Sequence, residues 1–385
     1  MKILISTDAY AAITNGVVTS VKNLRQELLK LGHDVKILTL SPSTESFIDR
    51  DENIIYLGSF DISILYPDAR FTLAWKSPLI DEILEWNPDI IHSQSEFTTF
   101  HIARIIKKKL HIPHVHTYHT LYEDYTHYFS KSETIGKMLV EKFTKTISDK
   151  TTAFIVPTIK TKNIIEDYGL TKPIHIVPTG LEEEKFETIY SKEEIQKLKE
   201  DLGIPQKNKV LLFVGRVGKE KNISEILEYL NKVQRSDISF VIVGEGPERR
   251  DLEEYTKSIG MDYVIFTGLV QNEMINIYYQ MADLFVSAST SETQGLTYVE
   301  ALFNGLPVLC RDDICLRDPI VQNETGYRYN NYEEFKEQLT KFLDNSNILE
   351  EMSEKCRAHA IKNCSAKAFA NNILDVYKEY VKGVN

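Results

Sequence analysis

The sequence predicts an α/β protein built from two doubly wound domains that face each other across a cleft. Three observations support this prediction. The chain has 385 residues, which is too many for one hydrophobic core of ordinary size. Short apolar strands alternate with helices over roughly the first half of the chain, as is typical of a parallel sheet covered on both faces. The same alternation then starts again after a charged stretch, EEEKFETIYSKEEIQKLKEDLG.

The first domain is assigned to residues 1–182, completed by a C-terminal helix over 365–385, and the second to residues 203–364. Strands of the first domain are predicted in KILIST, DVKILTL, PDIIHS, PHVHTYH, TAFIVPT and IHIVPTG. Strands of the second are predicted in KVLLFVGRV, SFVIVGEGP, YVIFTG, DLFVSA and LPVLC. Open α/β sheets bind ligands at the carboxyl ends of their strands, so we expect functional residues in the loops there.

The charge of the chain excludes some functions. A net charge of −11 argues against a general nucleic-acid binder. Residues 104–162 differ, because eleven Lys and Arg there outnumber five Asp and Glu. Such a segment either attracts an anionic membrane surface or ligand, or forms the solvated face of two helices. No stretch approaches the ~20 apolar residues of a membrane span. The four cysteines lack a metal-type spacing and are expected to be reduced thiols of a cytoplasmic protein, although a disulfide stays open.

The segment SETQGLTYVEAL, residues 291–302, joins a predicted strand to a predicted helix. It places Glu292, Gly295 and Glu300 around the start of that helix. A glycine-containing loop before a helix N-terminus presents backbone N–H groups and can bind an anion. A carboxylate in this position is therefore either a helix cap or a ligand for a sugar.

Two further strand ends of the second domain carry polar residues. FVGRVGKEKN places Arg216 and Lys221 where a guanidinium fork and a point charge can hold a diphosphate. The alternative is a surface ion pair with Glu220 or Glu225. The next strand ends in a Gly-Glu-Gly turn around Glu245, and glycines allow the backbone to approach a flat ring closely.

Histidines are concentrated in the first domain, with seven of ten between His92 and His127. His114 and His116 share one face of a predicted strand, and His119 lies past its end. A structural zinc site is the minor alternative, because the stretch contains no cysteine or carboxylate ligand. We expect most of these histidines to pack or hydrogen-bond, and His119 to project into the cleft.

Two other loops of the first domain are candidates for ligand contact. TNGVV places Gly16 directly before a helix, where backbone N–H groups can face an anion. LYEDYTHYF gathers aromatic rings and carboxylates, including Tyr122 and Tyr125, which either hold a hydroxyl-bearing acceptor or form an ordinary aromatic patch.

The segments NGVVTSV, HTYHT, GRVGKEKN and SETQGLTYVEA occur together in this chain, each at a predicted strand end. Together they resemble the retaining, nucleotide-sugar-dependent glycosyltransferases of the GT-B fold, which has two Rossmann-like domains. The resemblance covers essentially the whole chain. HTYHTLYEDYTHYF with SASTSETQGLTY is similar to the bacterial glucosyltransferases that make monoglucosyl-diacylglycerol or add a second sugar to it.

The resemblance implies roles for the residues at matching positions. Arg216 and Lys221 would hold the donor diphosphate and stabilise charge on the leaving group. Glu292 would accept hydrogen bonds from the sugar hydroxyls, and Glu300 from the ribose. His119 would lie by the sugar C6 hydroxyl or the reaction centre. The remaining donor contacts are expected at Gly16, Glu245, Val270, Gln294, Gly295 and Leu296.

The implied reaction transfers glucose from UDP-glucose to the 3-hydroxyl of 1,2-diacylglycerol with retention. The family suggests front-side attack with the donor phosphate as base, and no double-displacement nucleophile is identifiable. A diphosphate is already a good leaving group, so the acidic pair of a glycoside hydrolase is not needed. No cofactor or metal is implied, and Asp49-Arg50-Asp51 is interpreted as a chance match to a metal-binding DxD pattern. The oligomeric state stays open.

A membrane partner is expected from SETIGKMLVEKFTKTISDK. On a helix this segment places Ile135, Met138, Leu139 and Phe143 on one side, with lysines around them. The alternative is an ordinary core-facing amphipathic helix. A membrane-attached protein would lie on the inner face of the cell membrane as a peripheral enzyme. The lysines expected to face anionic lipid are Lys107, Lys108, Lys109, Lys137, Lys142 and Lys145.

Other functions remain as alternatives. Within the same class, the acceptor is monoglucosyl-diacylglycerol or a soluble polysaccharide or protein. A UDP-sugar epimerase uses a related fold, but it would leave the basic amphipathic segment without a role. A two-lobed solute-binding protein would require a secretion signal, which MKILISTDAY does not resemble.

Overall fold

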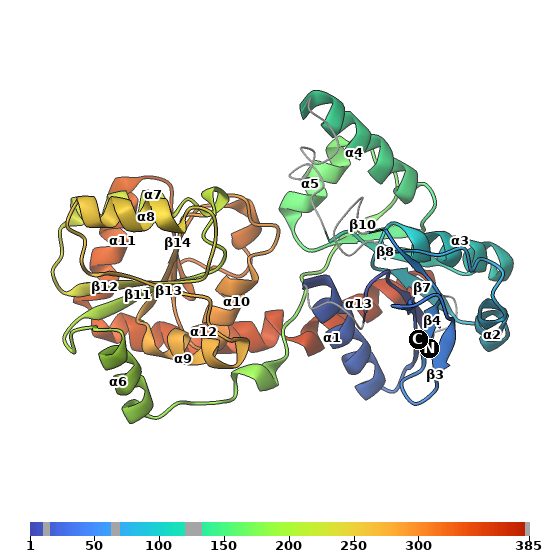
Figure 1. Cartoon of the computed structure of the whole chain (residues 1–385), viewed down its shortest axis with the longest axis horizontal. Helices are drawn as coiled ribbons and strands as arrows, with labels where there is room; N and C mark the ends of the chain where they lie inside the picture. The colour runs from blue at the N-terminus through green and yellow to red at the C-terminus, as the bar shows by residue number, and fades with distance from the viewer. Residues whose placement is uncertain (11–15, 63–69, 120–132, 382–385) are drawn as a thin grey trace. The chain divides into compact units, whose positions relative to one another are not determined.

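The chain folds into two compact units in a computed structural model (Figure 1). Unit 1 comprises residues 1–180 and 366–385, and unit 2 comprises residues 181–365. Residues 183–202, which lie between the two predicted domains, belong to unit 2. The structure describes residues 1–10, 16–62, 70–119 and 133–381.

Unit 1 is built on an eight-stranded sheet with the order β10-β9-β8-β7-β1-β2-β4-β3. Every neighbouring pair in it is parallel except β3 with β4. A separate antiparallel pair, β5 with β6, lies outside the sheet. The strands are β1 (Lys2–Ser6), β2 (Asp34–Leu40), β3 (Phe47–Asp49), β4 (Ile54–Leu57), β5 (Phe60–Asp61), β6 (Arg70–Phe71), β7 (Ile90–Ser93), β8 (His114–Thr117), β9 (Ala153–Val156) and β10 (Ile174–Ile176).

Helices cover both faces of this sheet. The described helices are α1 (Gly16–Lys30), α2 (Pro78–Trp86), α3 (Thr98–Leu110), α4 (Glu133–Ser148), α5 (Ile159–Asp167) and α13 (Ala366–Tyr380). Ile3 and Ile5 of β1 pack against α1 and α13, whereas Leu4 packs against α2 and α3. Alternate residues of a strand point to opposite faces, so an uninterrupted apolar run suits a strand buried on both sides. The C-terminal helix α13 thus completes the core of unit 1.

Unit 2 has a six-stranded parallel sheet with the order β13-β12-β11-β14-β15-β16. Its strands are β11 (Lys209–Val214), β12 (Ile238–Val243), β13 (Val264–Gly268), β14 (Leu284–Ser287), β15 (Val308–Arg311) and β16 (Gly326–Tyr329). Its longer helices are α6 (Lys192–Asp201), α7 (Ile223–Val233), α8 (Arg249–Ser258), α9 (Ile275–Met281), α10 (Leu296–Phe303), α11 (Tyr332–Asp344) and α12 (Ser346–Cys364). Short 3₁₀ turns are η2 (Glu183–Phe186), η3 (Lys219–Lys221), η4 (Asn272–Met274) and η5 (Ile314–Leu316).

The two faces of the unit 2 sheet have separate cores. Leu212 of β11 packs with α9, α10 and α12, and Leu211 packs with α7 and α11. The α10 helix lies where the sequence predicts it and ends before Gly305, which has a φ of +70°. All four cysteines are buried and have free thiols. None of the described helices has the length and apolarity needed to cross a membrane.

Several strands in both units are not predicted by the sequence pattern. β16 escaped because it begins with a glycine and contains Arg328, so it lacks a long apolar run. Its glycine is required by the pairing with β15, since a Cβ at Gly326 would lie 2.1 Å from the carbonyl oxygen of Val308. β4 was missed because four apolar residues are too short a signal to separate a strand from a buried loop.

Candidate donor-binding and catalytic site

The winding of the unit 2 sheet reverses between β11 and β14, which are neighbours in the sheet. Such a switch point is where open α/β sheets form a ligand crevice, beyond the carboxyl ends of the strands. The loop after β11 carries Arg216 and Lys221, and the loop after β14 carries Glu292. The fold therefore brings three predicted site residues to its most favourable binding edge.

Lys221 and Glu292 contact each other directly. The Lys221 Nζ lies 2.5 Å from Glu292 Oε1, and the two side chains are 21% and 13% exposed. Lys221 ends the short η3 turn, which closes on Asn222 in a left-handed conformation. An ion pair that is mostly removed from water is held in a defined geometry. The two residues are therefore close enough to act on one ligand, as the predicted roles at the diphosphate and the sugar require.

Arg216 is placed differently from Lys221. Its side chain is 68% exposed, and its Nη1 lies 3.9 Å from Glu220 Oε1. An exposed pair at that distance contributes little, so the guanidinium is accessible to a ligand. Glu225, the other partner weighed from the sequence, instead accepts hydrogen bonds from Arg311 Nη1 at 2.5 Å and from the Tyr329 hydroxyl at 3.2 Å. That carboxylate joins α7 to β15 and β16.

The glycines after β12 also have a structural role, because they lie against the loop after β11. A Cβ on Gly244 would lie 1.9 Å from the carbonyl oxygen of Gly215, and one on Gly246 would lie 2.1 Å from that of Val217. The φ angle of Gly244 is +142°. The glycines therefore allow two loops of the protein to approach each other closely, and the predicted approach of a flat ring to this turn stays a prediction. These glycines set the shape of the loop that presents Arg216.

The start of α10 provides backbone N–H groups. Gly295 is its N-cap residue, with a φ of +74°, and as a glycine it has no side chain to cap the first turn. A Cβ on Gly295 would lie 2.8 Å from Tyr298 Cδ2. Gln294 and Leu296, on either side, are half-buried. The N–H groups in the first turn of a helix attract an anion, so the geometry suits the backbone contacts predicted here.

Glu300 lies on α10 and is fixed by a residue that the sequence analysis missed. Its Oε2 accepts a hydrogen bond of 2.8 Å from the hydroxyl of Tyr279 on α9. Burial raises the pKa of Glu300 above its ordinary value, and the hydrogen bond from Tyr279 opposes that shift. The bond from Tyr279 fixes the orientation of the Glu300 carboxylate. A carboxylate held in this way suits the predicted contact with the two hydroxyls of a ribose. Nothing in the spacing of the sequence links positions 279 and 300.

The other predicted donor contacts of unit 2 lie on neighbouring strand ends. Glu245 forms an ion pair with Arg249, which also binds Glu253 with an Nε–Oε1 distance of 2.8 Å. Val270 follows β13 and is half-buried against the unit 2 core, and Leu269 beside it is 81% exposed. An exposed leucine beside a half-buried valine offers an apolar surface of the kind that a base ring contacts.

The sheet of unit 1 has its own switch point, between β1 and β7. Beyond β1, Asp8 accepts hydrogen bonds from the backbone N–H groups of Thr98 at 3.1 Å and Thr99 at 2.7 Å. This carboxylate therefore caps the N-terminus of α3. Burial nevertheless raises the pKa of Asp8 above its ordinary value, because it outweighs those bonds. Asp8 is not among the residues that the sequence motifs predict for the site.

His119 follows β8, as predicted, and is held by a chain of buried polar side chains. Its Nε2 lies 2.6 Å from Gln94 Oε1, and the amide nitrogen of Gln94 lies 3.0 Å from His92 Nε2. His92 also contacts the Thr117 hydroxyl at Nε2 and the Tyr377 hydroxyl at Nδ1, both at 2.6 Å. An amide oxygen only accepts, so His119 carries its proton on Nε2 and leaves Nδ1 as an acceptor. Gln94 is thus a positioning residue that sequence spacing did not reveal.

The neighbouring histidines pack and hydrogen-bond, as predicted. His114 and His116 are fully buried, and both bond the Ser93 hydroxyl at 2.8 Å. His116 Nε2 also lies 3.4 Å from Glu96 Oε1. In the described part of the chain, no three His, Cys, Asp or Glu side chains are grouped closely enough to hold a metal ion.

The buried histidines predict how stability depends on pH. Burial lowers the pKa of His119 to about 4 from 6.5, and it also depresses the pKa values of His92 and His114. The unfolded histidines take up protons below about pH 6.5, whereas the folded ones do not, so stability is present above that pH and lost toward pH 4. We expect the melting temperature to fall between pH 7 and pH 5. The fall should be smaller in His119→Gln; a fall of unchanged size would contradict this role for His119.

Gly16 begins α1, and a Cβ there would meet no atom of the described residues within 4 Å. Those residues therefore do not require a glycine at this position, in contrast to Gly244. We expect Gly16→Ala to change stability by less than about 0.5 kcal/mol, and Gly244→Ala to destabilise unit 2 by about 3 kcal/mol or more. If a ligand approaches the backbone at Gly16, Gly16→Ala still lowers transfer activity. Thermal melting and an activity assay on each variant separate the two effects, and full activity would remove Gly16 from the site.

The predicted membrane-facing residues lie on α3 and α4. Ile135, Met138 and Leu139 are about half exposed, at 51%, 58% and 48%, so they do not form the core-facing side of α4. Residues on its other side, including Val140 and Ile147, are buried instead. The lysines on these two helices are exposed except Lys107, which is half-buried and donates a 3.0 Å bond to the Lys150 carbonyl. Tyr122 and Tyr125, the predicted acceptor contacts, fall outside the described residues.

Comparison with known proteins agrees with this architecture. The model of Glycosyltransferase Family 4 matches residues 14–185, and that of Glycosyl transferases group 1 matches residues 194–379. The chain superimposes with a TM-score of 0.70 on Anabaena HepE crystallised with UDP and glucose, over 98% of this chain and 100% of that one at 15% identity. Two Rossmann-like units with charged loops at both switch points thus define a protein of the GT-B fold.

Two relatives of known name specify the family more closely. The chain is 33% identical to an alpha-monoglucosyldiacylglycerol synthase of Streptococcus pneumoniae, over 99% of this chain and 86% of that protein. It is 32% identical to the synthase of the same name from Acholeplasma laidlawii, over the full length of both. The chain therefore belongs to the GT-B glycosyltransferases, in the family that contains these two synthases. Its class of activity is that of a hexosyltransferase.

Proposed function

We propose that this protein transfers glucose from UDP-glucose to the 3-hydroxyl of 1,2-diacylglycerol at a membrane surface, with retention at the anomeric carbon. The main support for this proposal is the sequence identity of the chain, over essentially its whole length, to two alpha-monoglucosyldiacylglycerol synthases. The crystallisation of HepE with UDP and glucose supports a UDP-linked donor. The loops at the unit 2 switch point carry two cations that can bind a diphosphate, Arg216 and Lys221, and a carboxylate that can bind sugar hydroxyls, Glu292.

In the proposed reaction, Arg216 and Lys221 bind the diphosphate and stabilise the negative charge that grows on UDP as the glycosidic bond breaks. Glu292 orients the glucose through its hydroxyls, and it can also share the Lys221 ammonium with the phosphate. The acceptor hydroxyl attacks from the side of the leaving phosphate, which removes its proton. Neutral His119 accepts a hydrogen bond at Nδ1 because Gln94 holds the proton on Nε2.

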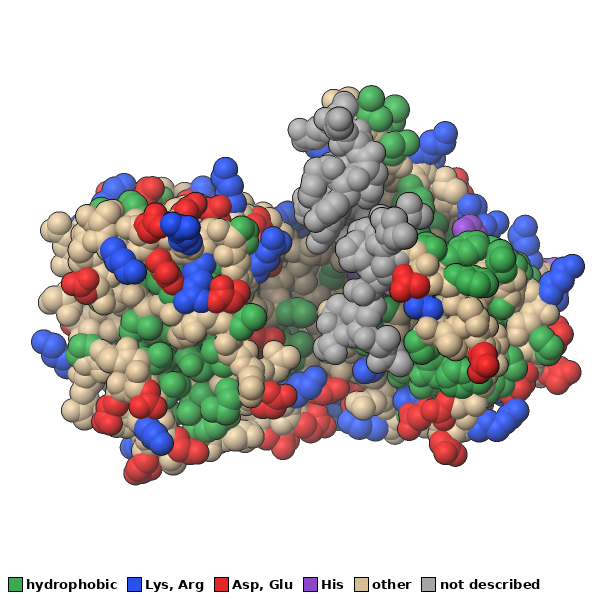
Figure 2. All heavy atoms as spheres, viewed as in Figure 1, with side chains coloured by type: hydrophobic (Ala, Val, Ile, Leu, Met, Phe, Trp, Pro, Cys, Tyr) green, Lys and Arg blue, Asp and Glu red, His purple; other side chains and the backbone are tan. Residues whose placement is uncertain are grey.

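The proposed location at a membrane surface rests on α4. Its exposed apolar residues lie among lysines, and Figure 2 shows hydrophobic and basic side chains side by side over this helix, at the top of the view. Phe143, on the same helix, stacks on the 53% exposed Phe97 with 6.1 Å between ring centroids, which extends the apolar surface toward α3. Half-exposed apolar side chains ringed by cations match an interfacial helix better than a solvated one.

Removing the charge of α4 should weaken membrane binding. We expect Lys137→Gln, Lys142→Gln and Lys145→Gln together to lower affinity for vesicles containing phosphatidylglycerol by about a hundred-fold, since each lysine contributes up to about 1 kcal/mol. Replacing the same three lysines by arginine should preserve binding. Co-sedimentation measures both variants. Equal binding by the glutamine and arginine variants would exclude α4 as the membrane contact.

An acceptor assay tests the proposed function. The protein is incubated with radiolabelled UDP-glucose and liposomes that contain 1,2-diacylglycerol, and the mixture is then partitioned between water and organic solvent. The proposal predicts label in the organic phase that depends on diacylglycerol. Label that appears in lipid only when monoglucosyl-diacylglycerol is supplied would identify the second-sugar reaction instead. Label converted to another UDP-sugar without acceptor would identify an epimerase.

A further inference from the structure

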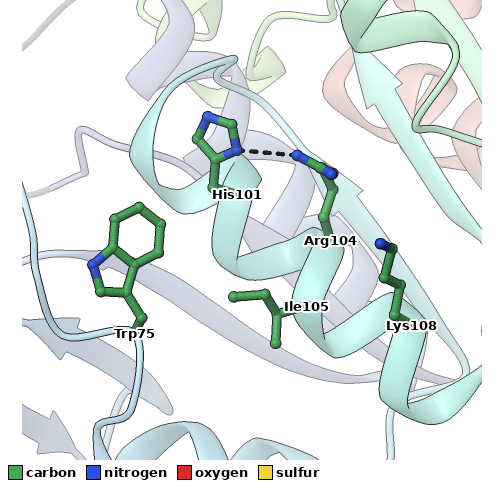
Figure 3. A pocket seen from close by; sticks show the side chains of 5 residues that line it. All are labelled: Trp75, His101, Arg104, Ile105 and Lys108. Carbon is green, nitrogen blue, oxygen red and sulfur yellow. Dashed lines mark hydrogen bonds between the residues drawn. The ribbon is translucent and has the colours of Figure 1, made fainter.

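A small pocket opens on unit 1 between α3 and the loop that precedes α2. It encloses about 160 Å³ and is lined by Trp75, His101, Arg104, Ile105 and Lys108 (Figure 3). That volume is about ten times what a single water molecule needs, so it accommodates a group of several atoms. His101, Arg104 and Lys108 follow at intervals of three and four residues, which places them along one side of α3. No predicted donor or catalytic residue lines this pocket.

The pocket is cationic. Arg104 Nη1 lies 3.2 Å from His101 Nδ1, and among the described residues no carboxylate lies within ion-pair distance of Arg104 or Lys108. Two more lysines, Lys107 and Lys150, are near enough for Arg104 to contribute to the lowering of their pKa values, although burial is the larger cause for each. Cations gathered in this way repel each other, and an anion placed among them relieves that repulsion.

Exposed apolar side chains lie on the segment that carries Trp75. Phe71 and Leu73 are 38% and 64% exposed. The ring centroids of Phe71 and Trp75 are 6.1 Å apart, and those of Trp75 and His101 are 6.4 Å apart. Figure 2 shows a hydrophobic patch over the α2 and α3 region with basic and histidine atoms at its edge. An anion site bordered by apolar rings fits a ligand with a charged head and an apolar body.

We propose that this pocket binds the phosphate of an anionic phospholipid in the membrane, with Phe71 and Leu73 contacting the apolar part of the bilayer. The Arg104 guanidinium matches phosphate oxygens in pairs, and Lys108 adds a point charge. Trp75 has the amphipathic ring that favours the level of the headgroups. This inference rests on the proposed activity at a membrane surface and extends it. The lysines of α4 attract anionic lipids in general, whereas the pocket would bind one lipid headgroup at a defined site.

Tryptophan fluorescence tests the proposal. The chain contains two tryptophans, so Trp86→Phe leaves Trp75 as the reporter. In that background we titrate vesicles of phosphatidylcholine with and without phosphatidylglycerol, with no sugar donor present. We expect Trp75 emission to change only with phosphatidylglycerol. Arg104→Gln with Lys108→Gln should lower the affinity about thirty-fold, the loss expected of two cations near an anionic surface.

A charge-matched control separates the pocket from net charge. Lys355→Gln with Lys362→Gln removes two exposed cations from α12 of unit 2 and should leave the titration unchanged. The proposal would be overturned if both double variants lost the same affinity for the vesicles. It would also be overturned if the pocket variant kept its full affinity at an unaltered melting temperature. Sodium phosphate that binds as tightly as lipid phosphate while vesicles have no effect would overturn it as well. Because no donor is present, these outcomes are independent of whether the protein transfers glucose.

Discussion

Replacing Arg216 and Lys221 together by methionine is expected to lower the affinity for UDP by at least about a hundred-fold. Each charge-assisted hydrogen bond to a phosphate contributes about 1.5–3 kcal/mol, so loss of both removes roughly 3 kcal/mol or more. Methionine keeps much of the length of each side chain and removes only the charge. The loss of Lys221 also leaves the Glu292 carboxylate, 13% exposed, without its 2.5 Å partner. That carboxylate would then repel the diphosphate.

Calorimetric titration with UDP measures this effect. Lys219→Met is the matched control, because Lys219 is exposed and lies in the same η3 turn. We expect it to bind UDP with nearly unchanged affinity. The single variants divide the effect, and Lys221→Met should cause the larger part because the Lys221 side chain is the less exposed of the two. Unchanged UDP affinity in the double variant would show that these cations do not hold the diphosphate.

Glu292→Gln is expected to lower turnover by about a hundred-fold or more while UDP affinity stays nearly intact. Glutamine preserves the shape of the side chain but accepts weaker hydrogen bonds from the sugar, which UDP alone lacks. The substitution also releases Lys221 from its ion pair, so UDP affinity is expected to rise slightly rather than fall. A fall in turnover without a fall in UDP affinity would distinguish loss of a sugar contact from damage to the nucleotide site.

Steady-state kinetics with UDP-glucose and calorimetry with UDP, on the same preparation, provide both readouts. Glu220→Gln serves as the control, since this carboxylate lies on the same loop as Lys221 and is 40% exposed. It should keep its turnover. Normal turnover of Glu292→Gln would remove the proposed sugar contact, and equal losses of turnover and UDP affinity would reassign Glu292 to the support of Lys221.

Much of the fold follows from local patterns in the sequence. The strand before Arg216 is a short apolar run with polar residues directly after it, so the unit 2 sheet and its ligand-binding edge were predictable. Short strands such as β4 and β16 were not, because their apolar signal is too brief. The sequence also predicted that α4 has an apolar side. It did not decide whether that side is exposed or faces the core. The structure decides that question, since Met138 is 58% exposed.

The partners of the site residues could not be predicted, because they depend on contacts between distant parts of the chain. Gln94 reaches His119 across neighbouring strands β7 and β8, and Tyr279 reaches Glu300 from another helix. The Lys221–Glu292 pair joins loops that are 71 residues apart. The spacing of residues within one motif carries no information about such pairs. The pairing of the strands, and the packing of α9 and α10 in one core, bring these residues together.

The anomeric configuration of the lipid product is the most direct test of the proposed transfer of glucose to diacylglycerol with retention. The protein is incubated with UDP-α-glucose and 1,2-diacylglycerol in liposomes, the lipids are extracted, and the anomeric proton of the product is examined by NMR. We expect a single glucose in α-linkage to the 3-hydroxyl of diacylglycerol. A β-linked product would contradict the retaining mechanism, and the absence of any glucosylated diacylglycerol would contradict the proposed function.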